Sequence, residues 1–156
     1  MADVVDKATR SRMMSGIRAK NTKPEMFLRQ GLHALGFRFR LHAKDIPGKP
    51  DIVLPKYQAL IVVHGCFWHG HECRYFKLPE TRQEFWQTKI GNNRIRDEHD
   101  LQNQQAKGWR VLTIWECAVR ASTKSCPSLD CVALAVRWLE SGLKSATIDE
   151  QGLRGT

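Results

Sequence analysis

The sequence predicts an α/β protein in which helices pack on a mixed β-sheet. Residues 59–63 are the longest purely apolar run, which is typical of a central strand covered on both faces. A second buried strand is predicted at 110–115, after a long polar segment that ends at Gly108. The predicted order of helix, three strands, helix, strand and helix favours an α/β sandwich. With 156 residues, the chain is long enough for one domain with its own core.

The first predicted helix begins at Thr22, whose hydroxyl can cap it, with Pro24 in the first turn and Glu25 at the capping-box position. Leucines follow at helical spacing, and Gly36 is placed to end the helix. Residues 37–41 then alternate apolar and basic side chains, which predicts a half-buried strand with a basic outer face.

A hairpin is predicted next, with strands at 51–54 and 59–63. Antiparallel pairing about the turn places Asp51 opposite Val62 or Val63. An acidic side chain is therefore expected beside the end of a buried strand.

The rest of the chain is expected to add two helices and one strand. A capping box at 81–84 opens a mostly polar helix that runs to Lys107, and the strand at 110–115 follows. Residues 129–139 predict a late helix, whereas the segment 143–156 carries little signal and is expected to be a tail.

Charge and composition limit the function. Lysine and arginine number 25 against 16 acidic residues, a formal net charge of +9, which favours a polyanionic partner, nucleic acid before membrane. The composition, 42% hydrophobic and 26% charged, excludes a mainly disordered chain. No segment has the apolar length of a signal peptide or a membrane span, so we expect a cytoplasmic protein. Five cysteines in a reducing compartment argue against a disulfide framework and favour a metal site.

Four residues have the spacing of a metal site. Cys66, His71 and Cys73 lie within eight residues after one buried strand, and Cys117 lies just past the other. If the two strands are parallel neighbours, their carboxyl ends meet, and the four residues make a Cys3His set that suits structural zinc. The alternative is that they are ordinary buried thiols. The other two cysteines are expected to be free thiols: Cys126 and Cys131.

Two large aromatic residues, Phe67 and Trp68, lie between these ligands and cannot both turn into the core. Aromatic side chains held on a basic protein can stack on bases or enter a base step as a wedge. The alternative is that they cover the metal site.

A second group of candidate catalytic residues is expected around Asp51. Its carboxylate and the carbonyl at the end of the neighbouring strand suit Mg²⁺. His64 and His69 flank the adjacent loop as candidate bases, with Glu25 and Asp97 as further acids that can orient water or a histidine. The alternatives are that Glu25 only caps its helix and that Asp97 is a solvated charge. The remaining histidines are expected at the surface: His33, His42 and His99.

Several sequence blocks occur in order along the chain: residues 6–11 with Met14, 47–51, 64–69, 85–86 with 89–91, 96–97, 108–111 and 115–117. Together they resemble the very short patch repair (Vsr) endonucleases, over about residues 3–118. The histidine, cysteine and aromatic block at 64–69 is highly specific. The resemblance implies a restriction-endonuclease-like fold and Mg²⁺-dependent nicking of duplex DNA, 5′ to the thymine of a T:G mismatch left by deamination of 5-methylcytosine.

The resemblance also implies roles for single residues. Asp51 matches the magnesium-binding acid, and the main-chain carbonyl of Val63 matches a second contact to the ion. The family has threonine where Val63 stands, so any role of that hydroxyl is absent here. His69 matches the general base, with Asp97 beside it. Two further positions match residues that support the reaction: Glu25 and His64.

The zinc ligands of the family match the set inferred from spacing: Cys66, His71, Cys73 and Cys117. Phe67 and Trp68 match an aromatic wedge, and Met14 matches a wedge that enters the other groove. Lys89 and Asn93, one helical turn apart, match residues that face the mismatch.

The expected organisation is a basic arm that contacts DNA at 1–21, an endonuclease domain at 22–142 and a tail at 143–156. The expected partner is double-stranded DNA with a T:G mismatch, bound by a monomer, with mismatch-repair proteins and a DNA polymerase acting downstream. Two alternatives stay open: a restriction-type nuclease on undamaged DNA, and a non-catalytic DNA-binding module held together by zinc.

Overall fold

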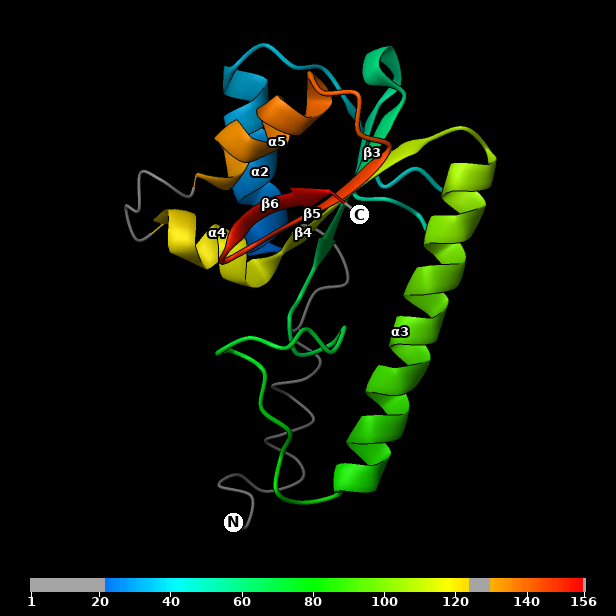
Figure 1. The fold of residues 1–156 in the computed structure, drawn as a ribbon, viewed down its shortest axis with the longest axis vertical. Helices are drawn as coiled ribbons and strands as arrows, with labels where there is room; N and C mark the ends of the chain where they lie inside the picture. The colour runs from blue at the N-terminus through cyan, green and yellow to red at the C-terminus, as the bar shows by residue number, and fades with distance from the viewer. Residues whose placement is uncertain (1–21, 124–129, 156) are drawn as a thin grey trace.

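A computed structural model describes residues 22–123 and 130–155 (Figure 1). One mixed sheet contains the strands β1 (Arg40–Leu41), β2 (Ile52–Leu54), β3 (Ala59–His64), β4 (Arg110–Trp115), β5 (Ser145–Asp149) and β6 (Gly152–Gly155), in that order. The helices in the described part are α2 (Lys23–Ala34), α3 (Gln83–Ala106), α4 (Glu116–Thr123) and α5 (Cys131–Leu139), with a short 3-10 turn at Pro55–Tyr57. The predicted α/β class with a mixed sheet is confirmed.

The strand pairing brings two carboxyl ends together. β3 and β4 are parallel neighbours, paired from Ala59 with Arg110 to His64 with Trp115. β4 and β5 are also parallel, whereas the other neighbouring pairs are antiparallel. The loop after β3 and the helix after β4 therefore start side by side, as the sequence analysis requires for a shared metal site.

Different helices cover the two faces of the sheet. α2, α4 and α5 pack on one face around the fully buried Trp138. The other face carries a smaller apolar cluster that includes Val53 and Leu60, and Leu101 of α3 packs against it. Figure 1 shows α3 standing apart from the other helices. Across residues 22–123 and 130–155, no helix has both the length and the apolar character that a bilayer crossing needs.

The predicted start of the first helix is confirmed. Thr22 is the N-cap of α2, and its hydroxyl accepts a hydrogen bond from the Glu25 amide at 3.5 Å. Leu28 and Leu32 are fully buried, whereas Leu35 is 61% exposed because it lies at the C-cap. The helix therefore presents a narrower apolar face than its leucine spacing suggests.

Other predicted elements are corrected. The predicted capping box at 81–84 is wrong, because the N-cap of α3 is Arg82, in left-handed backbone (φ 56°) without a side-chain cap. The strand predicted at 37–41 pairs only at 40–41, since the aromatic side chains before it pack against the core. β4 runs directly into α4, which the sequence analysis does not predict. Beyond Gly142, where a tail is expected, β5 and β6 extend the sheet.

Arg110, at the start of β4, anchors the end of α5. Its guanidinium donates hydrogen bonds to the carbonyls of Trp138 (2.8 Å) and Ser141 (2.9 Å) and lies over the Trp138 ring at 4.5 Å. Arg110→Met keeps much of the stem but removes these donors, so the free energy of unfolding is expected to fall by about 2–3 kcal/mol. Urea denaturation measures the loss. The exposed Arg38→Met is the control, expected within about 0.5 kcal/mol of the unmodified protein; an equal loss in both variants would contradict the anchoring role.

Candidate active site and cysteine cluster

Three groups of chemically active side chains lie near the carboxyl ends of β3 and β4. Among the residues that the structure describes, they are Cys66, His71, Cys73 and Cys117; His64, His69 and Asp97; and Glu25, His42 and Asp51. Within each group, the possible ligand atoms lie within 4.8 Å of one another.

The cysteine cluster joins the loop after β3 to the first turn of α4. Cys66 and Cys117 each lie two positions beyond the paired strand ends and are 2% and 1% exposed. Nδ1 of His71 lies 3.7 Å from Cys117 Sγ, and the His71 amide donates to the Cys66 carbonyl at 2.9 Å. A hydrogen bond from the Cys66 thiol lowers the pKa of Cys117 to about 7. Three thiols and one imidazole so arranged fit a closed tetrahedral zinc site.

Two residues hold the imidazole of His71 from its other side. Nε2 of His71 lies 3.6 Å from Oδ2 of Asp149, a 3% exposed acid at the end of β5. The Trp115 ring stacks on His71 with centroids 4.3 Å apart. Asp149 also accepts the Gln151 amide at 2.8 Å and pairs with Arg154. Asp149 is not among the residues predicted from the sequence, because no strand is predicted in that segment.

Phe67 and Trp68 form an aromatic cluster outside the apolar core. Their ring centroids lie 5.1 Å apart, and both rings contact Trp86 of α3, at 5.5 and 5.8 Å. The side chain of Asn93, also on α3, donates to the Trp68 carbonyl at 2.9 Å. Both aromatic side chains stay partly exposed, so α3 supports them at the surface.

His69 pairs with Asp97 beside this cluster. Nδ1 of His69 lies 2.5 Å from Oδ2 of Asp97, which leaves the other ring nitrogen as a proton acceptor when Nδ1 carries the proton. The ring of His64 stacks on His69 at 3.8 Å. Burial, together with the nearby His69, lowers the pKa of His64 to about 3, so His64 is neutral at neutral pH. An acid-oriented histidine next to a neutral one is an arrangement suited to accepting a proton.

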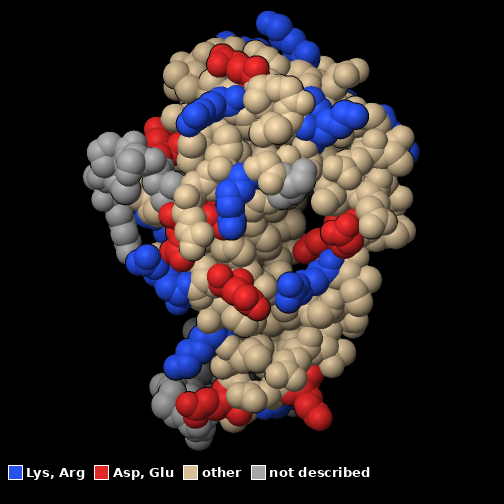
Figure 2. Space-filling view, viewed as in Figure 1, with Lys and Arg blue, Asp and Glu red and all other residues tan. Residues whose placement is uncertain are grey.

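A cavity of about 510 Å³ opens between α3 and the sheet, next to the histidine pair. His64, His69 and Asp97 line it, together with acidic residues of α3. Figure 2 shows acidic side chains bordering this hollow and charges of both signs interspersed over the rest of the face. The basic surplus of the sequence is therefore not gathered in one patch on this face.

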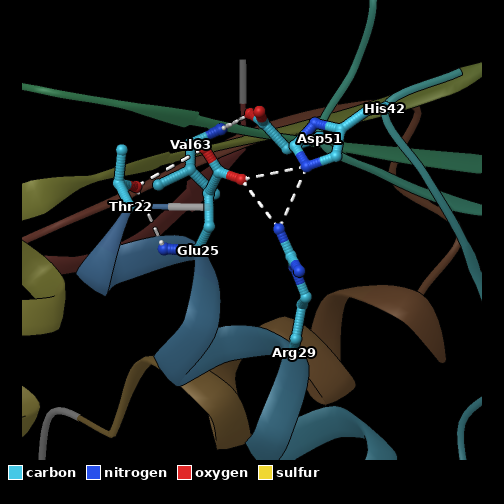
Figure 3. A network of polar contacts seen from close by, with 6 residues as sticks. All are labelled: Thr22, Glu25, Arg29, His42, Asp51 and Val63. Atoms are coloured by element: carbon cyan, nitrogen blue, oxygen red, sulfur yellow. Dashed lines mark hydrogen bonds and ion pairs between the residues drawn. The ribbon is translucent and has the colours of Figure 1, made fainter. Parts of the chain in front are cut away.

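The acid centre lies between α2 and the start of the hairpin (Figure 3). Oδ2 of Asp51 accepts a hydrogen bond from the Val63 amide at 2.7 Å, in agreement with the predicted pairing. Glu25, 3% exposed, reaches this centre from the first turn of α2. One turn later, Nη2 of Arg29 lies 3.2 Å from Oε2 of Glu25. Glu25 therefore does more than cap its helix.

His42 belongs to this centre, and its predicted surface position is wrong. Its Nε2 lies 3.5 Å from Oε2 of Glu25, and its amide donates to the Asp51 carbonyl at 3.3 Å. The pairing of β1 with β2 sets this position, because Leu41 pairs with Ile52 and the next residues on each side are His42 and Asp51. The hairpin register is the signal that could have found it. His33 and His99 are exposed, as predicted.

The remaining predicted residues lie elsewhere. Lys89 is exposed on α3. Cys131 is a free thiol buried in the core. Met14 and Cys126 lie outside the described residues, as does the predicted arm at 1–21.

Burial of Asp51 disfavours its charged form. Burial and the neighbouring Glu25 carboxylate outweigh the Val63 hydrogen bond and raise the pKa of Asp51 to about 7, against about 3.9 in an unfolded chain. Without magnesium, ionisation of Asp51 should therefore destabilise the fold progressively from about pH 4 to pH 7. Relative to Asp51→Asn, the protein is expected to lose stability over this range, by on the order of 1 kcal/mol per pH unit. Urea denaturation at pH 5, 6, 7 and 8 tests this; a constant difference would contradict it.

Comparison with known proteins gives the family. A family profile described as DNA mismatch endonuclease Vsr matches residues 2–75. The DNA mismatch endonuclease Vsr of Escherichia coli K12 is 46% identical over 156 residues, 98% of this chain and 97% of its own length. The chain belongs to the Vsr family of DNA mismatch endonucleases. As a Vsr endonuclease it is a DNA-cleaving enzyme, which argues against the non-catalytic binding module.

Two further relatives of this Vsr endonuclease are named as nicking enzymes. The type II nicking enzyme V.XorIIP of Xanthomonas oryzae pv. oryzae is 48% identical over 117 residues, 75% of this chain and 86% of its own. The type II nicking enzyme V.NmeAIP of Neisseria meningitidis is 40% identical over 120 residues, 77% of this chain and 86% of its own.

Proposed function

We propose that this Vsr endonuclease nicks one strand of duplex DNA 5′ to the thymine of a T:G mismatch, in a Mg²⁺-dependent hydrolysis. The observation that carries this proposal is the arrangement at the end of β3. The acid-oriented His69 and the half-buried Asp51 lie near the same strand end, next to a loop that presents two aromatic rings. The name of the Escherichia coli relative, a DNA mismatch endonuclease, supports the choice of substrate.

In this proposal Asp51 and the main-chain carbonyl of Val63 hold Mg²⁺, a hard ion that prefers oxygen ligands. The bound ion would stabilise charge on the phosphodiester and help to generate hydroxide from water. His69 accepts the proton of the attacking water, while Asp97 orients its ring and stabilises the imidazolium. His64 and Glu25 support these groups. His64 stacks on the ring of His69, which favours His69 as the proton acceptor and His64 as its support.

Zinc held by Cys66, His71, Cys73 and Cys117 has a structural role in this proposal. All four positions are filled by protein ligands, which leaves no open site for water or substrate. The ion would fix the ends of the loop that carries His69 and the two aromatic rings. Chemistry and DNA contact would then both depend on the zinc site.

Recognition would use the aromatic rings as a wedge. A T:G pair is less well stacked and paired than a Watson–Crick pair, so opening it costs less. Phe67 and Trp68 enter the base step in this proposal, with Met14 entering from the other groove, while basic side chains hold the backbone without reading sequence. Lys89 faces the mismatch. Asn93 also faces the mismatch in this proposal, and it positions the aromatic loop through its hydrogen bond to the Trp68 carbonyl.

Trp68→Ala should reduce mismatch preference more than overall affinity. Loss of one stacked ring is expected to lower the ratio of T:G to T:A affinity about tenfold, with matched-duplex affinity changed less than about threefold. Fluorescence anisotropy with both duplexes measures this. Ile95→Ala, which truncates a side chain 70% exposed on α3, is the control. Equal losses on the two duplexes would refute the wedge.

We further propose that the sheet is restriction-endonuclease-like and that the endonuclease domain, predicted at 22–142, follows an arm at 1–21 that lies on the DNA. β5 and β6 join the same sheet, so we extend the domain beyond the predicted tail boundary. A cytoplasmic monomer that cuts one strand, followed by mismatch-repair proteins and a DNA polymerase, completes the proposal. A monomer suits an asymmetric lesion that is cut on one strand.

Two end-labelled duplexes that differ only in one base pair, T:G or T:A, test the function. Several flanking sequences are included, and Mg²⁺ or EDTA is added. A single Mg²⁺-dependent nick beside the thymine of T:G alone supports the proposal. The nicking-enzyme names of two relatives keep a restriction-type activity as second candidate, and equal cutting of T:A would favour it.

A further inference from the structure

The acid centre contains a nitrogen ligand that the proposed magnesium site does not use. Nε2 of His42 faces Glu25 Oε2 at 3.5 Å, and the ligand atoms of Glu25, His42 and Asp51 lie within 4.8 Å of one another. The three side chains come from α2, from the residue after β1 and from the residue before β2. Figure 3 shows them converging on one point.

The contact with Arg29 indicates which ring nitrogen of His42 carries no proton. Its Nη2 lies 3.0 Å from Nε2 of His42 and 3.2 Å from Oε2 of Glu25. A guanidinium group can only donate hydrogen bonds, so Nε2 is the acceptor and the ring proton is on Nδ1. The lone pair of Nε2 therefore faces the guanidinium of Arg29, and a metal ion can use it only in place of that group (Figure 3).

The composition of the group determines which ion suits it. Mg²⁺ prefers an all-oxygen shell, whereas an imidazole nitrogen binds transition ions better. Mn²⁺ accepts carboxylate oxygen as readily as Mg²⁺ does and gains more from one nitrogen ligand. We propose that His42 binds the catalytic divalent ion through Nε2, together with Glu25 and Asp51, and that the site therefore prefers Mn²⁺ to Mg²⁺. This inference rests on the proposed function, because it concerns the same ion.

Arg29 competes with the ion in this proposal. Its positive charge lies at the electron pair that the ion needs, so binding requires the guanidinium to move off Nε2. The side chain is long and its backbone is in α2, so this displacement requires a change of the Arg29 side-chain conformation and not of the helix. Arg29→Met should then bind both ions more tightly, by about tenfold or less, because a nearby positive charge is removed.

The test uses the full chain, loaded with zinc so that the cysteines are occupied, and Mn²⁺ as the probe without DNA. Pulsed electron paramagnetic resonance detects nitrogen bound to Mn²⁺, and titrations give the dissociation constants for Mn²⁺ and Mg²⁺. His42→Asn is the main variant, because His42 has left-handed backbone (φ 49°) that asparagine tolerates and because the shorter side chain lacks the ring. His99→Asn, on the exposed side of α3, is the matched control.

We expect a nitrogen signal in the unmodified protein and in His99→Asn, and none in His42→Asn. Mn²⁺ affinity should fall at least about tenfold in His42→Asn while Mg²⁺ affinity falls less than about threefold. A nitrogen signal that persists in His42→Asn, its absence from the unmodified protein, or weaker ion binding by Arg29→Met would overturn the inference. If nitrogen is absent but Mg²⁺-dependent nicking of T:G duplex persists, only this inference fails. If no duplex is cut with either ion, the proposed function fails.

Discussion

Asp51→Ala is expected to abolish nicking of a T:G duplex, by about a thousandfold or more in the single-turnover rate, while duplex binding persists. The Asp51 carboxylate is the group of the acid centre that β3 holds in place: it accepts a hydrogen bond from the Val63 amide at 2.7 Å. In the proposed function, its loss removes a charged ligand of the ion and leaves the residues of the aromatic loop unchanged. Single-turnover cleavage of end-labelled DNA with Mg²⁺ measures the rate, and fluorescence anisotropy measures binding.

Asp45→Ala is the matched control for this experiment. Asp45 lies in the loop before β2, like Asp51, but its side chain is 67% exposed and pairs with Arg40 at 2.8 Å. Its nicking rate should match that of the unmodified protein. Asp51→Asn adds an isosteric variant that keeps an acceptor for Val63 while losing the charge. Mg²⁺-dependent nicking retained by both Asp51 variants would contradict the assignment of the ion to this residue.

Cys117→Ser should release zinc and lower both stability and activity. Structural zinc supplies on the order of 10 kcal/mol to the folding of small domains, so we expect the melting temperature to fall by about 10 °C or more. Nicking should fall with it, because the loop between Cys66 and Cys73 carries His69 and its aromatic neighbours. Zinc released to a coloured chelator, together with thermal denaturation, measures the two effects.

Cys131→Ala distinguishes loss of zinc from loss of a buried thiol. Cys131 is fully buried in the core at the start of α5, away from the cluster. This variant should keep one zinc per chain and most of its activity, with a smaller loss of stability. The structural-zinc proposal would be wrong if Cys117→Ser retained zinc as firmly as Cys131→Ala does.

Much of the cysteine cluster is predictable because its geometry depends on two strongly apolar strands. Residues 59–63 and 110–115 can hardly be anything other than buried strands, and parallel pairing then brings Cys66 and Cys117 together. The position of Asp51 follows from the hairpin turn in the same way. These inferences need only strand periodicity and register.

The residues that sequence analysis misses depend on weak elements. Asp149 lies in the strand 145–149, which begins with the small side chains of Ser145 and Ala146, so the segment has little apolar signal. α4 follows β4 without a glycine or proline between them, so nothing in the sequence marks the change. His42 needs the pairing of a two-residue strand, which propensity alone does not give. Asn93 is named from the resemblance alone, and its hydrogen bond to the Trp68 carbonyl is a contact that no local pattern predicts.

The equal offset of Cys66 and Cys117 beyond the paired ends of β3 and β4 has a consequence for folding order. The two cysteines are distant in the chain, and closing so long a loop costs entropy before any contact forms. The complete ligand set can therefore assemble only after the parallel strands have met. Zinc capture should be a late step that reports correct alignment, since a slip of one residue would carry Cys117 away from the other three ligands. If zinc binds as proposed, its binding would therefore report that β3 and β4 have paired in the correct register.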